Sequence, residues 1–413
     1  MKENTNANTS ISKMIILGLQ HLIAMFGATV LVPILTGLPI TVALLSAGIG
    51  TLIFHFVTDK KVPVFLGSSF AFIPVILQVK EMYNGDLAYA TGGIFFAGLI
   101  YVAFSFIIKK IGVEKIDKFL PARVIGPMII VVGLNLIPTA LNMAMGNIYI
   151  ALFTLLVCLF ITKFTKGFIR QLSILIAVSS GYIVSLLTNN VDTSLITEAK
   201  LFTLPPVFLP KFDLGAILTI CPIVIAVFME HLGDIKTNGQ VVGKDFIKDP
   251  GLNRTLLGDG LATSVASLLG GPANTTYGEN TAVLAITKNF DTRILRLAAV
   301  FAIILSFFGK LGGVMQSIPT FVMGGISLIL FSMIALVGVK TIKTNKVKFN
   351  FQNILIMASI LFLGFFGSYI EKKFGIVLGI TINEAVAIKG LSFAALVGII
   401  LNAIVTKIEE KEK

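Results

Sequence analysis

The stretch GGPANTTYGENTAVLAITK (270–288) decides the fold, because Gly, Pro and polar residues interrupt it while its neighbours are long apolar runs. A second stretch of the same kind, PVFLGSSFAFIPVIL (63–77), occurs early in the chain. Non-helical backbone at membrane depth is tolerated only where protein or a water-filled cavity satisfies its hydrogen bonds. Each stretch is therefore predicted to run extended for a few residues before a half-helix begins.

The composition around these two stretches is typical of a membrane protein. Hydrophobic residues make up 55% of the 413 residues and charged residues 13%, whereas soluble domains contain about 25% charged residues. Runs that approach the roughly 20 residues of a membrane-spanning helix lie at 14–32, 39–57, 88–108, 120–138, 147–162, 168–187, 214–230, 255–270, 293–309, 319–339, 352–367 and 391–406. The sequence predicts an all-α polytopic membrane protein and excludes a cytosolic enzyme, a nucleic-acid-binding module and a disordered chain.

The distribution of basic residues fixes the expected topology. If both interrupted stretches also cross and the N-terminus is cytoplasmic, 26 of the 33 Lys and Arg residues lie inside and 7 outside, as the positive-inside rule requires. The basic cluster at 109–123 stays inside only if the 69–79 piece crosses the bilayer. We therefore expect fourteen spans in the plasma or inner membrane, both termini in the cytoplasm, and a net charge of +12 that reflects topology and not nucleic acid.

Each interrupted stretch is the third span of a group of seven. Residues 1–190 then form the first repeat and residues 191–413 the second. Because seven is odd, the second repeat enters the membrane in the opposite orientation. Paired interrupted spans in inverted repeats indicate a transporter with its binding site near the midplane.

Three acidic residues stand out because they lie within or beside apolar segments. In the stretch AILTICPIVIAVFMEHLGD (216–234), Glu230 comes at the end of the apolar run and Asp234 follows one turn later. Glu279 lies inside the second interrupted stretch. An ionisable group at bilayer depth is a functional candidate, and burial disfavours its charged form, as suits a proton carrier. We therefore expect a proton as the coupling ion. The sequence contains no metal-ligand spacing, phosphate-binding loop or nucleophile–base set, so we expect no metal, no cofactor and no enzyme activity.

Several motifs support a more specific reading. They are QHLIAMFGATVLVPIL (20–35), VPVFLGSSFAFI (62–73), EHLGD (230–234), RTLLGDGLATSVASLLGGPANTTYGEN (254–280) and IPTFVMGGISLIL (318–330). Over nearly the whole chain the sequence resembles the nucleobase–ascorbate transporter family, and within it the bacterial uracil permeases. It departs from the family at Ala282, where the signature has Gly, and at Asp234, where some uracil permeases carry His.

The resemblance implies two domains and a placed site. A core domain takes spans 1–4 and 8–11, about 13–110 and 213–316, and a gate domain takes spans 5–7 and 12–14, about 119–190 and 318–408. Short extended strands in broken segments 3 and 10 meet at the substrate. The family also suggests a homodimer.

The resemblance further assigns roles to individual residues. Glu230 and Glu279 are expected to hydrogen-bond the base, assisted by the Gly278 backbone, while Phe70 packs beside the ring and Ala28 lines the pocket. Apart from the resemblance, Tyr277 is also expected at the substrate, where the bulk of Phe70, Phe72 and Tyr277 would crowd a second ring. Proton coupling is expected to involve Glu279 and Glu230, with Asp234 as a relay.

The favoured hypothesis is proton-coupled uptake of uracil by alternating access. Hydrogen-bond chemistry alone does not separate pyrimidines from purines, so the same machine carrying xanthine, urate or another purine is the alternative. An anion transporter is disfavoured because Glu279 at the mouth of a half-helix repels anions.

Overall fold

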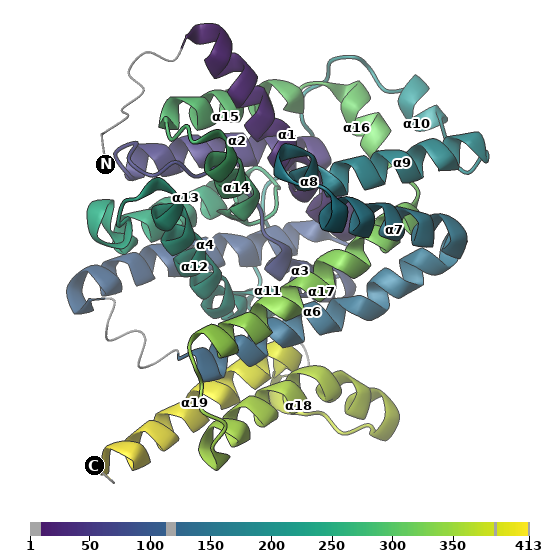
Figure 1. Cartoon of the computed structure of the whole chain (residues 1–413). Coiled ribbons are helices and arrows are strands. Elements are labelled where there is room, and N and C mark those ends of the chain that lie inside the picture. The colour runs from purple at the N-terminus through teal and green to yellow at the C-terminus, as the bar shows by residue number, and fades with distance from the viewer. Residues whose placement is uncertain (1–9, 113–120, 384–385, 412–413) are drawn as a thin grey trace.

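The computed structural model describes residues 10–112, 121–383 and 386–411, and it is mostly helical (Figure 1). The extreme termini, whose cytoplasmic location the sequence predicts, and the expected start of the gate at 119 lie outside the described residues. The helices and strands of the first half are α1 (Ile11–Thr36), α2 (Ile40–Val57), β1 (Leu66–Ser68), η1 (Phe70–Phe72), α3 (Ile73–Met82), α4 (Leu87–Ile111), α6 (Ala122–Ala144), η2 (Met145–Asn147), α7 (Ile148–Phe164), α8 (Gly167–Gln171) and α9 (Ser173–Leu187).

The second half contains a matching interrupted span and a longer C-terminal part. Its elements are α10 (Ser194–Thr197), α11 (Leu214–Ile220), η3 (Cys221–Ile223), α12 (Val224–Val242), η4 (Ile247–Gly251), α13 (Leu252–Leu268), β2 (Asn274–Thr276), α14 (Gly278–Thr287), α15 (Thr292–Ser306), α16 (Gly309–Gln316), α17 (Thr320–Thr344), α18 (Phe351–Phe374), β3 (Gly379–Asn383), β4 (Val386–Lys389) and α19 (Gly390–Lys411).

Six of the described helices begin where a polar side chain accepts a hydrogen bond from the first turn. The capping residues include Ser10, Asp86, Asn147, Asp213, Asp291 and Asn350. Such caps satisfy backbone N–H groups that have no partner inside the helix. Helices α3 and α14, which follow the two short strands, are among the described helices that have no capping side chain.

The helices pack in two groups, each built from both halves of the chain. In the first group α4 packs on α13 and α11, α2 on α15 and α13, and α1 on α15. In the second group α6 packs on α17 and α18, α7 on α9 and α17, and α18 on α19. Figure 1 shows α18 and α19 at one end of the molecule, far from α2 and α15.

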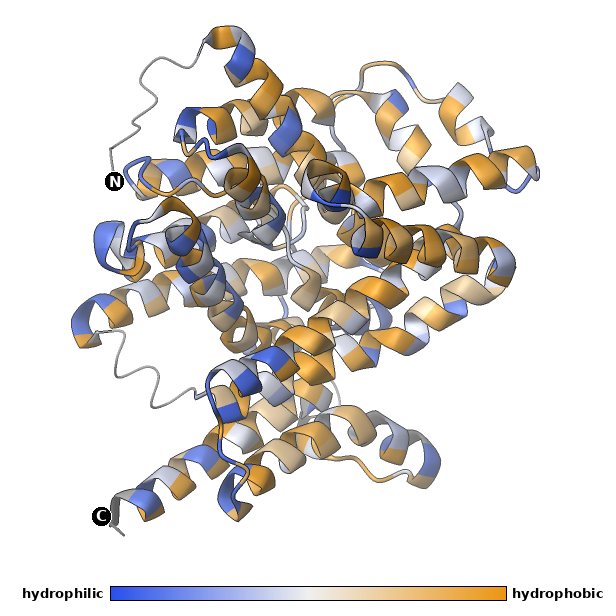
Figure 2. Ribbon diagram, in the orientation of Figure 1, coloured by the Kyte–Doolittle hydropathy of each residue, from blue (hydrophilic) through white to orange (hydrophobic). Residues whose placement is uncertain are grey.

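Six helical segments in the described part of the chain are long and apolar enough to cross a membrane. They are Ile11–Thr36, Ile40–Val57, Leu87–Ile111, Ala122–Phe164, Leu214–Val242 and Thr320–Thr344. Figure 2 shows hydrophobic residues along the helices and hydrophilic residues concentrated at helix ends and connections. The chain is therefore an integral membrane protein, and the count of fourteen spans stays a prediction.

The strands confirm one expectation and correct another. β1 and β2 lie in the two interrupted stretches, as predicted, and pair antiparallel with Leu66 opposite Thr276 and Ser68 opposite Asn274. A second antiparallel pair, β3 with β4, was not expected. Its sequence contains Ile380 and Val386, and β-branched residues favour strands. The expected run at 168–187 is also divided, because a turn at Leu172 separates α8 from α9.

Candidate functional site

The β1–β2 pair forms a crossing in the middle of the first helix group, and buried polar side chains hold it there. Thr51 Oγ1 accepts a hydrogen bond from Leu66 N at 2.9 Å, and Thr263 Oγ1 donates to Asn274 O at 3.0 Å. Asn274 Nδ2 donates to Ser46 O at 3.1 Å. The extended backbone is thus satisfied from α2 and α13, as non-helical backbone at membrane depth requires.

Glycine is required at the centre of the crossing. A Cβ at Gly67 would lie 2.8 Å from Thr29 Oγ1 and closer still to the Tyr277 ring. The Tyr277 ring is held beside Gly67 because its hydroxyl donates to Ser68 O at 3.0 Å and accepts from Thr29 Oγ1 at 3.3 Å. The two interrupted stretches and α1 are therefore locked together around one glycine.

Helix α14 starts directly after β2 with its first N–H groups uncapped. Gly278, its first residue, is exposed, and Glu279 in the first turn is half-buried. Free N–H groups and the positive end of the helix dipole favour a hydrogen-bond acceptor at this position. The start of α14 can therefore donate to a carbonyl oxygen of a ligand.

Two carboxylates of α12 lie beside this helix start. Asp234 Oδ2 accepts a hydrogen bond from Thr276 Oγ1 at 2.9 Å, which joins α12 to β2. Glu230, one turn earlier, is within electrostatic reach of Glu279. The structure thus brings together the three acidic residues that the sequence analysis selected, although Glu230 and Glu279 are 49 positions apart in the chain.

Glu230 and Phe70 line one cavity of about 70 Å³. Ala71 from the first interrupted stretch and Ala226 from α12 also line it on the side of the first helix group. The opposite wall is formed by apolar residues of the second helix group: Ile129, Val132, Ile334 and Val337. Glu230 is the single ionisable residue in this lining, and its side chain is open to the cavity. The cavity therefore combines one hydrogen-bonding group with an aromatic face between the two helix groups.

Two of the expected substrate contacts are buried and do not line this cavity. Ala28 is 2% exposed and Tyr277 is 4% exposed, and both pack in one buried cluster. The Tyr277 hydroxyl is hydrogen-bonded to Ser68 O and Thr29 Oγ1. Their contact with a substrate stays a prediction.

Four residues of α6 and α17 were missed by the sequence analysis, and so was Thr276. The apolar helices give no periodic signal that selects Ile129 or Val337, since all their faces are apolar. The buried pair of His231 and Asp259 was also missed: His231 Nδ1 lies 3.2 Å from Asp259 Oδ2, and its Nε2 lies 3.0 Å from Thr255 Oγ1. The signal that could have found Asp259 was its position inside an apolar run.

A larger cavity of about 150 Å³ lies elsewhere, between α1, α9, α16 and α17. Its lining is almost entirely apolar, and the Tyr182 hydroxyl in it is bonded to Ser317 Oγ at 2.7 Å. A polar base would lose its hydrogen bonds to water there without replacement. The smaller cavity at Glu230 is therefore the candidate site despite its size.

No group of three or more His, Cys, Asp or Glu residues that could hold a metal ion occurs in the part of the chain that the structure describes.

His21 is held by contacts with the Asn280 side chain. Its carbonyl oxygen accepts from Asn280 Nδ2 at 3.0 Å, and its ring Nδ1 lies 3.1 Å from the same nitrogen. This histidine joins α1 to α14 and does not reach the cavity lining.

Solved structures share this fold at low sequence identity. A structure of SLC26A9 matches with a TM-score of 0.70 at 11% identity, covering 98% of this chain and 67% of that chain. The transmembrane domain of the cyanobacterial bicarbonate transporter BicA matches with a TM-score of 0.60 at 16% identity, covering 94% and 96%. At such identities the likeness shows the fold alone.

Sequence comparisons are more specific. A "Probable uracil permease" of Haemophilus influenzae is 41% identical over 410 residues, covering 97% of this chain and 96% of that protein. The "Uracil permease" of Bacillus subtilis is 39% identical over 414 residues, covering 95% and 93%. The family model Xan_ur_permease, described as "Permease family", matches residues 12–373. This chain therefore belongs to that permease family, the nucleobase–ascorbate transporters.

Proposed function

We propose that this protein takes up uracil across the cytoplasmic membrane as a proton-coupled symporter. The observation that carries the proposal is the cavity lined by Phe70 and Glu230, with Glu279 at the uncapped start of α14 within electrostatic reach of Glu230. The relatives named uracil permease, 39–41% identical over nearly the full length, support this substrate. Permeases move their substrates without converting them, so we expect no enzyme activity.

The chemistry of uracil suits the groups at the site. Uracil is a flat neutral ring with two N–H donors and two carbonyl acceptors. The carboxylates of Glu230 and Glu279 accept from N–H groups, and the first N–H groups of α14, starting at Gly278, donate to a carbonyl. The Phe70 ring offers a stacking face, and aromatic stacking of a base is worth about 1–3 kcal/mol.

The residues that line the cavity favour one ring over two. Phe70 faces the apolar residues of α6 and α17 across it. Overpacking a well-packed wall is destabilising, so a second fused ring would meet steric resistance. Xanthine, urate and other purines are therefore expected to bind poorly. Inorganic anions are disfavoured by the carboxylates that face the site.

Proton coupling is proposed to run through Glu279, with Asp234 as relay and Glu230 as the partner that senses the base. The support is the proximity of the three carboxylates: Thr276 bonds Asp234, and Glu230 lies within electrostatic reach of both other acids. If protonation of one carboxylate and binding of the base favour each other, the two transport steps are coupled.

The transport cycle is proposed to be alternating access between a core and a gate. The core corresponds to about 13–110 and 213–316, and the gate to about 119–190 and 318–408. The two helix groups support this division, since each draws its helices from both halves of the chain. Fourteen spans, arranged as inverted repeats 1–190 and 191–413 with cytoplasmic termini, and a homodimeric assembly complete the proposal.

Uptake of radiolabelled uracil by cells that express the chain tests the function directly. Uptake should saturate, be reduced by excess unlabelled uracil and collapse with a protonophore, while xanthine and urate compete weakly. If xanthine competes as well as uracil does, the proposed substrate changes from uracil to a purine. Uptake that follows a sodium gradient would refute proton coupling.

Single-cysteine labelling tests the topology after Cys158 and Cys221 are replaced. Asn190→Cys and Lys407→Cys, both at exposed positions, should react with an impermeant maleimide from opposite sides of the membrane. Equal reaction of both from outside would contradict fourteen spans with cytoplasmic termini.

A further inference from the structure

The end of α17 and the segment that follows carry an exposed surface of unusual composition. The segment KTIKTNKVKFNF (340–351) contains four lysines and two phenylalanines and no acidic residue. All four lysine side chains are exposed, and Phe349 and Phe351 are 73% and 80% exposed. We call Lys340, Lys343, Lys346, Lys348, Phe349 and Phe351 the basic–aromatic surface.

Within the part of the chain that the structure describes, these lysines have no acidic partner, unlike basic residues at the ends of the first helix group. There, Lys61 pairs with Asp249, Arg254 with Asp59, and Lys248 lies 3.9 Å from Asp245. Among the described residues, no carboxylate lies within 4.0 Å of any lysine of the basic–aromatic surface. Topology alone requires positive charge on this side but does not require it to be unpaired.

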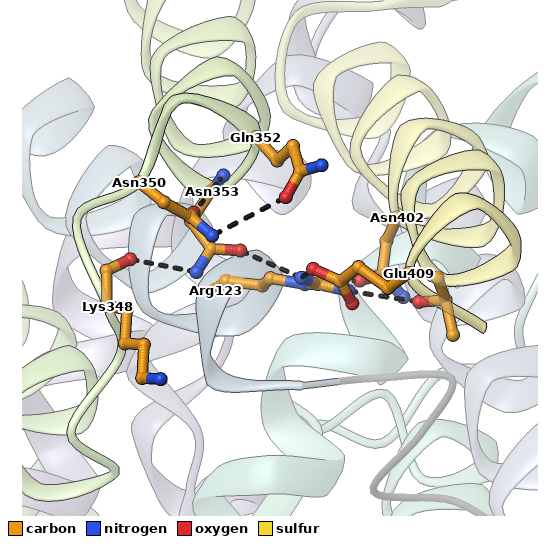
Figure 3. Close-up of polar contacts among 8 residues, drawn as sticks. Arg123, Lys348, Asn350, Gln352, Asn353, Asn402 and Glu409 are labelled. Carbon is orange, nitrogen blue, oxygen red and sulfur yellow. Dashed lines mark hydrogen bonds and ion pairs between the residues drawn. The ribbon is translucent and has the colours of Figure 1, made fainter. Parts of the chain in front are cut away.

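The backbone beneath the surface is held in place by a hydrogen-bond network (Figure 3). Asn353 Nδ2 donates to Lys348 O at 2.8 Å, and Asn350 Oδ1 accepts from Asn353 N at 2.9 Å. Arg123 Nη1 donates to Asn353 Oδ1 at 2.8 Å and to Glu409 Oε1 at 3.0 Å. The network joins the segment to α6 and α19, so the lysines and phenylalanines project from an ordered support.

We propose that the basic–aromatic surface binds the headgroup of an anionic phospholipid. Because α17 is an apolar membrane helix, its lysine-bearing end lies at the level of the headgroups. Lysines there attract anionic lipid. Exposed apolar side chains beside lysines insert at the boundary between headgroups and acyl chains, and Phe349 and Phe351 are placed to do so. The proposal rests on the membrane span of α17 and is independent of the transported base.

Lipid bound at this surface contacts the helix that forms one wall of the candidate site. Ile334 and Val337 of α17 line the cavity, and Lys340 follows Val337 by one helical turn. The bound headgroup therefore holds the wall-forming helix at the membrane surface. We expect anionic lipid to change the uptake rate more than the affinity for the transported base.

The absence of tryptophan from the chain gives a clean reporter. Phe351→Trp, reconstituted in bilayers that contain brominated phosphatidylglycerol or brominated phosphatidylcholine, reports lipid contact by fluorescence quenching. Phosphatidylglycerol should quench at a mole fraction that is lower by at least about fivefold, the preference that a single lysine near the surface contributes. High salt should weaken this preference. Phe349→Trp repeats the measurement if the first variant folds poorly.

Two sets of substitutions complete the test. Lys340→Gln, Lys343→Gln, Lys346→Gln and Lys348→Gln combined should remove most of the preference, whereas Lys236→Gln, Lys244→Gln and Lys248→Gln combined, at exposed positions in and after α12, should preserve it. Equal quenching by the two lipids, or an unchanged preference in the fourfold variant, would overturn the proposal. So would competition by millimolar inorganic phosphate, which would indicate a site for the free anion.

Discussion

Two regions lie next to the candidate site and are built in opposite ways. The crossing of β1 and β2 comes directly before Phe70 and Ala71, which line the cavity, and the seam between α6 and α17 forms the opposite wall. In the crossing, buried polar side chains such as Thr51, Thr263 and Asn274 hydrogen-bond to elements distant in the sequence. In the described part of the chain, no side-chain hydrogen bond joins α6 to α17. Those helices instead approach closely through glycines such as Gly133 and Gly338.

The difference indicates a division of labour. Directional hydrogen bonds fix the crossing in one register, so that Glu230, Phe70 and the start of α14 keep their positions relative to one another. Small-residue packing provides contact area without such directional restraints. Changes at the crossing should therefore act on binding and coupling, and changes at the seam should act on stability.

The largest effect is expected from Glu230→Gln, because it removes the single ionisable group of the cavity lining. A hydrogen bond to a charged group is worth about 1.5–3 kcal/mol, or roughly 10- to 150-fold in affinity. Uracil binding to the purified variant, measured by calorimetry, should be nearly lost while its melting temperature stays close to wild type. Glu81→Gln, at an exposed position, is the matched control. Wild-type affinity in Glu230→Gln would give Glu230 a structural role.

A second prediction separates the two other carboxylates. Uptake by the wild type should increase several-fold as the outside pH falls, because protonation accompanies inward movement. Glu279→Gln should still bind uracil but lose this pH response. If instead Asp234→Asn removes the response and Glu279→Gln keeps it, the carrier and the relay exchange roles. Uptake at several outside pH values, with binding measured in parallel, distinguishes the two cases.

The seam should respond to added volume. A Cβ at Gly133 would lie 2.5 Å from Ala335 N and 2.6 Å from Phe331 O, so α6 and α17 must separate. Gly133→Ala should destabilise the protein by about 1–3 kcal/mol, seen as a lower melting temperature. Gly367→Ala in α18, where no atom lies within 4 Å of the new Cβ, should not. Loss of uracil affinity in Gly133→Ala with unchanged melting would contradict the division of labour.

The smallest effect is expected outside the membrane spans, at the pair formed by Lys211 Nζ and Asp86 Oδ2 at 2.8 Å. The hydrogen bond from Lys211 holds the pKa of the Asp86 carboxyl below its ordinary value. The pair therefore stabilises the fold at neutral pH, and this contribution is lost as the pH falls through that lowered pKa. Since both side chains are partly exposed, Asp86→Asn should cost less than about 1 kcal/mol.

Melting at pH 7 and at acidic pH checks this prediction, with Lys211→Met as a control that should show the same small loss at pH 7. If the destabilisation caused by Asp86→Asn grows as the pH falls, the prediction is contradicted, because a carboxyl whose pKa is lowered on folding contributes less stability at acidic pH.

The sequence alone determined which segments are apolar helices, where two of them break, and which acidic residues lie within or beside apolar runs. These properties are local: a run of apolar residues, a Gly–Pro interruption or a carboxylate within such a run is visible in a short window. The extended strands in both broken segments and the membrane character of the chain were predicted in this way and confirmed by the structure.

Only the tertiary structure decided which side chains face the cavity. Phe70 and Glu230 line it, whereas Ala28 and Tyr277 are buried and do not line it. An apolar helix has no polar face to reveal its rotation. The register of strands more than 200 residues apart, with Gly67 opposite Thr275, depends on contacts that no local pattern encodes. The walls from α6 and α17 likewise exist only once the two helix groups pack together, because that packing places distant apolar residues opposite a carboxylate.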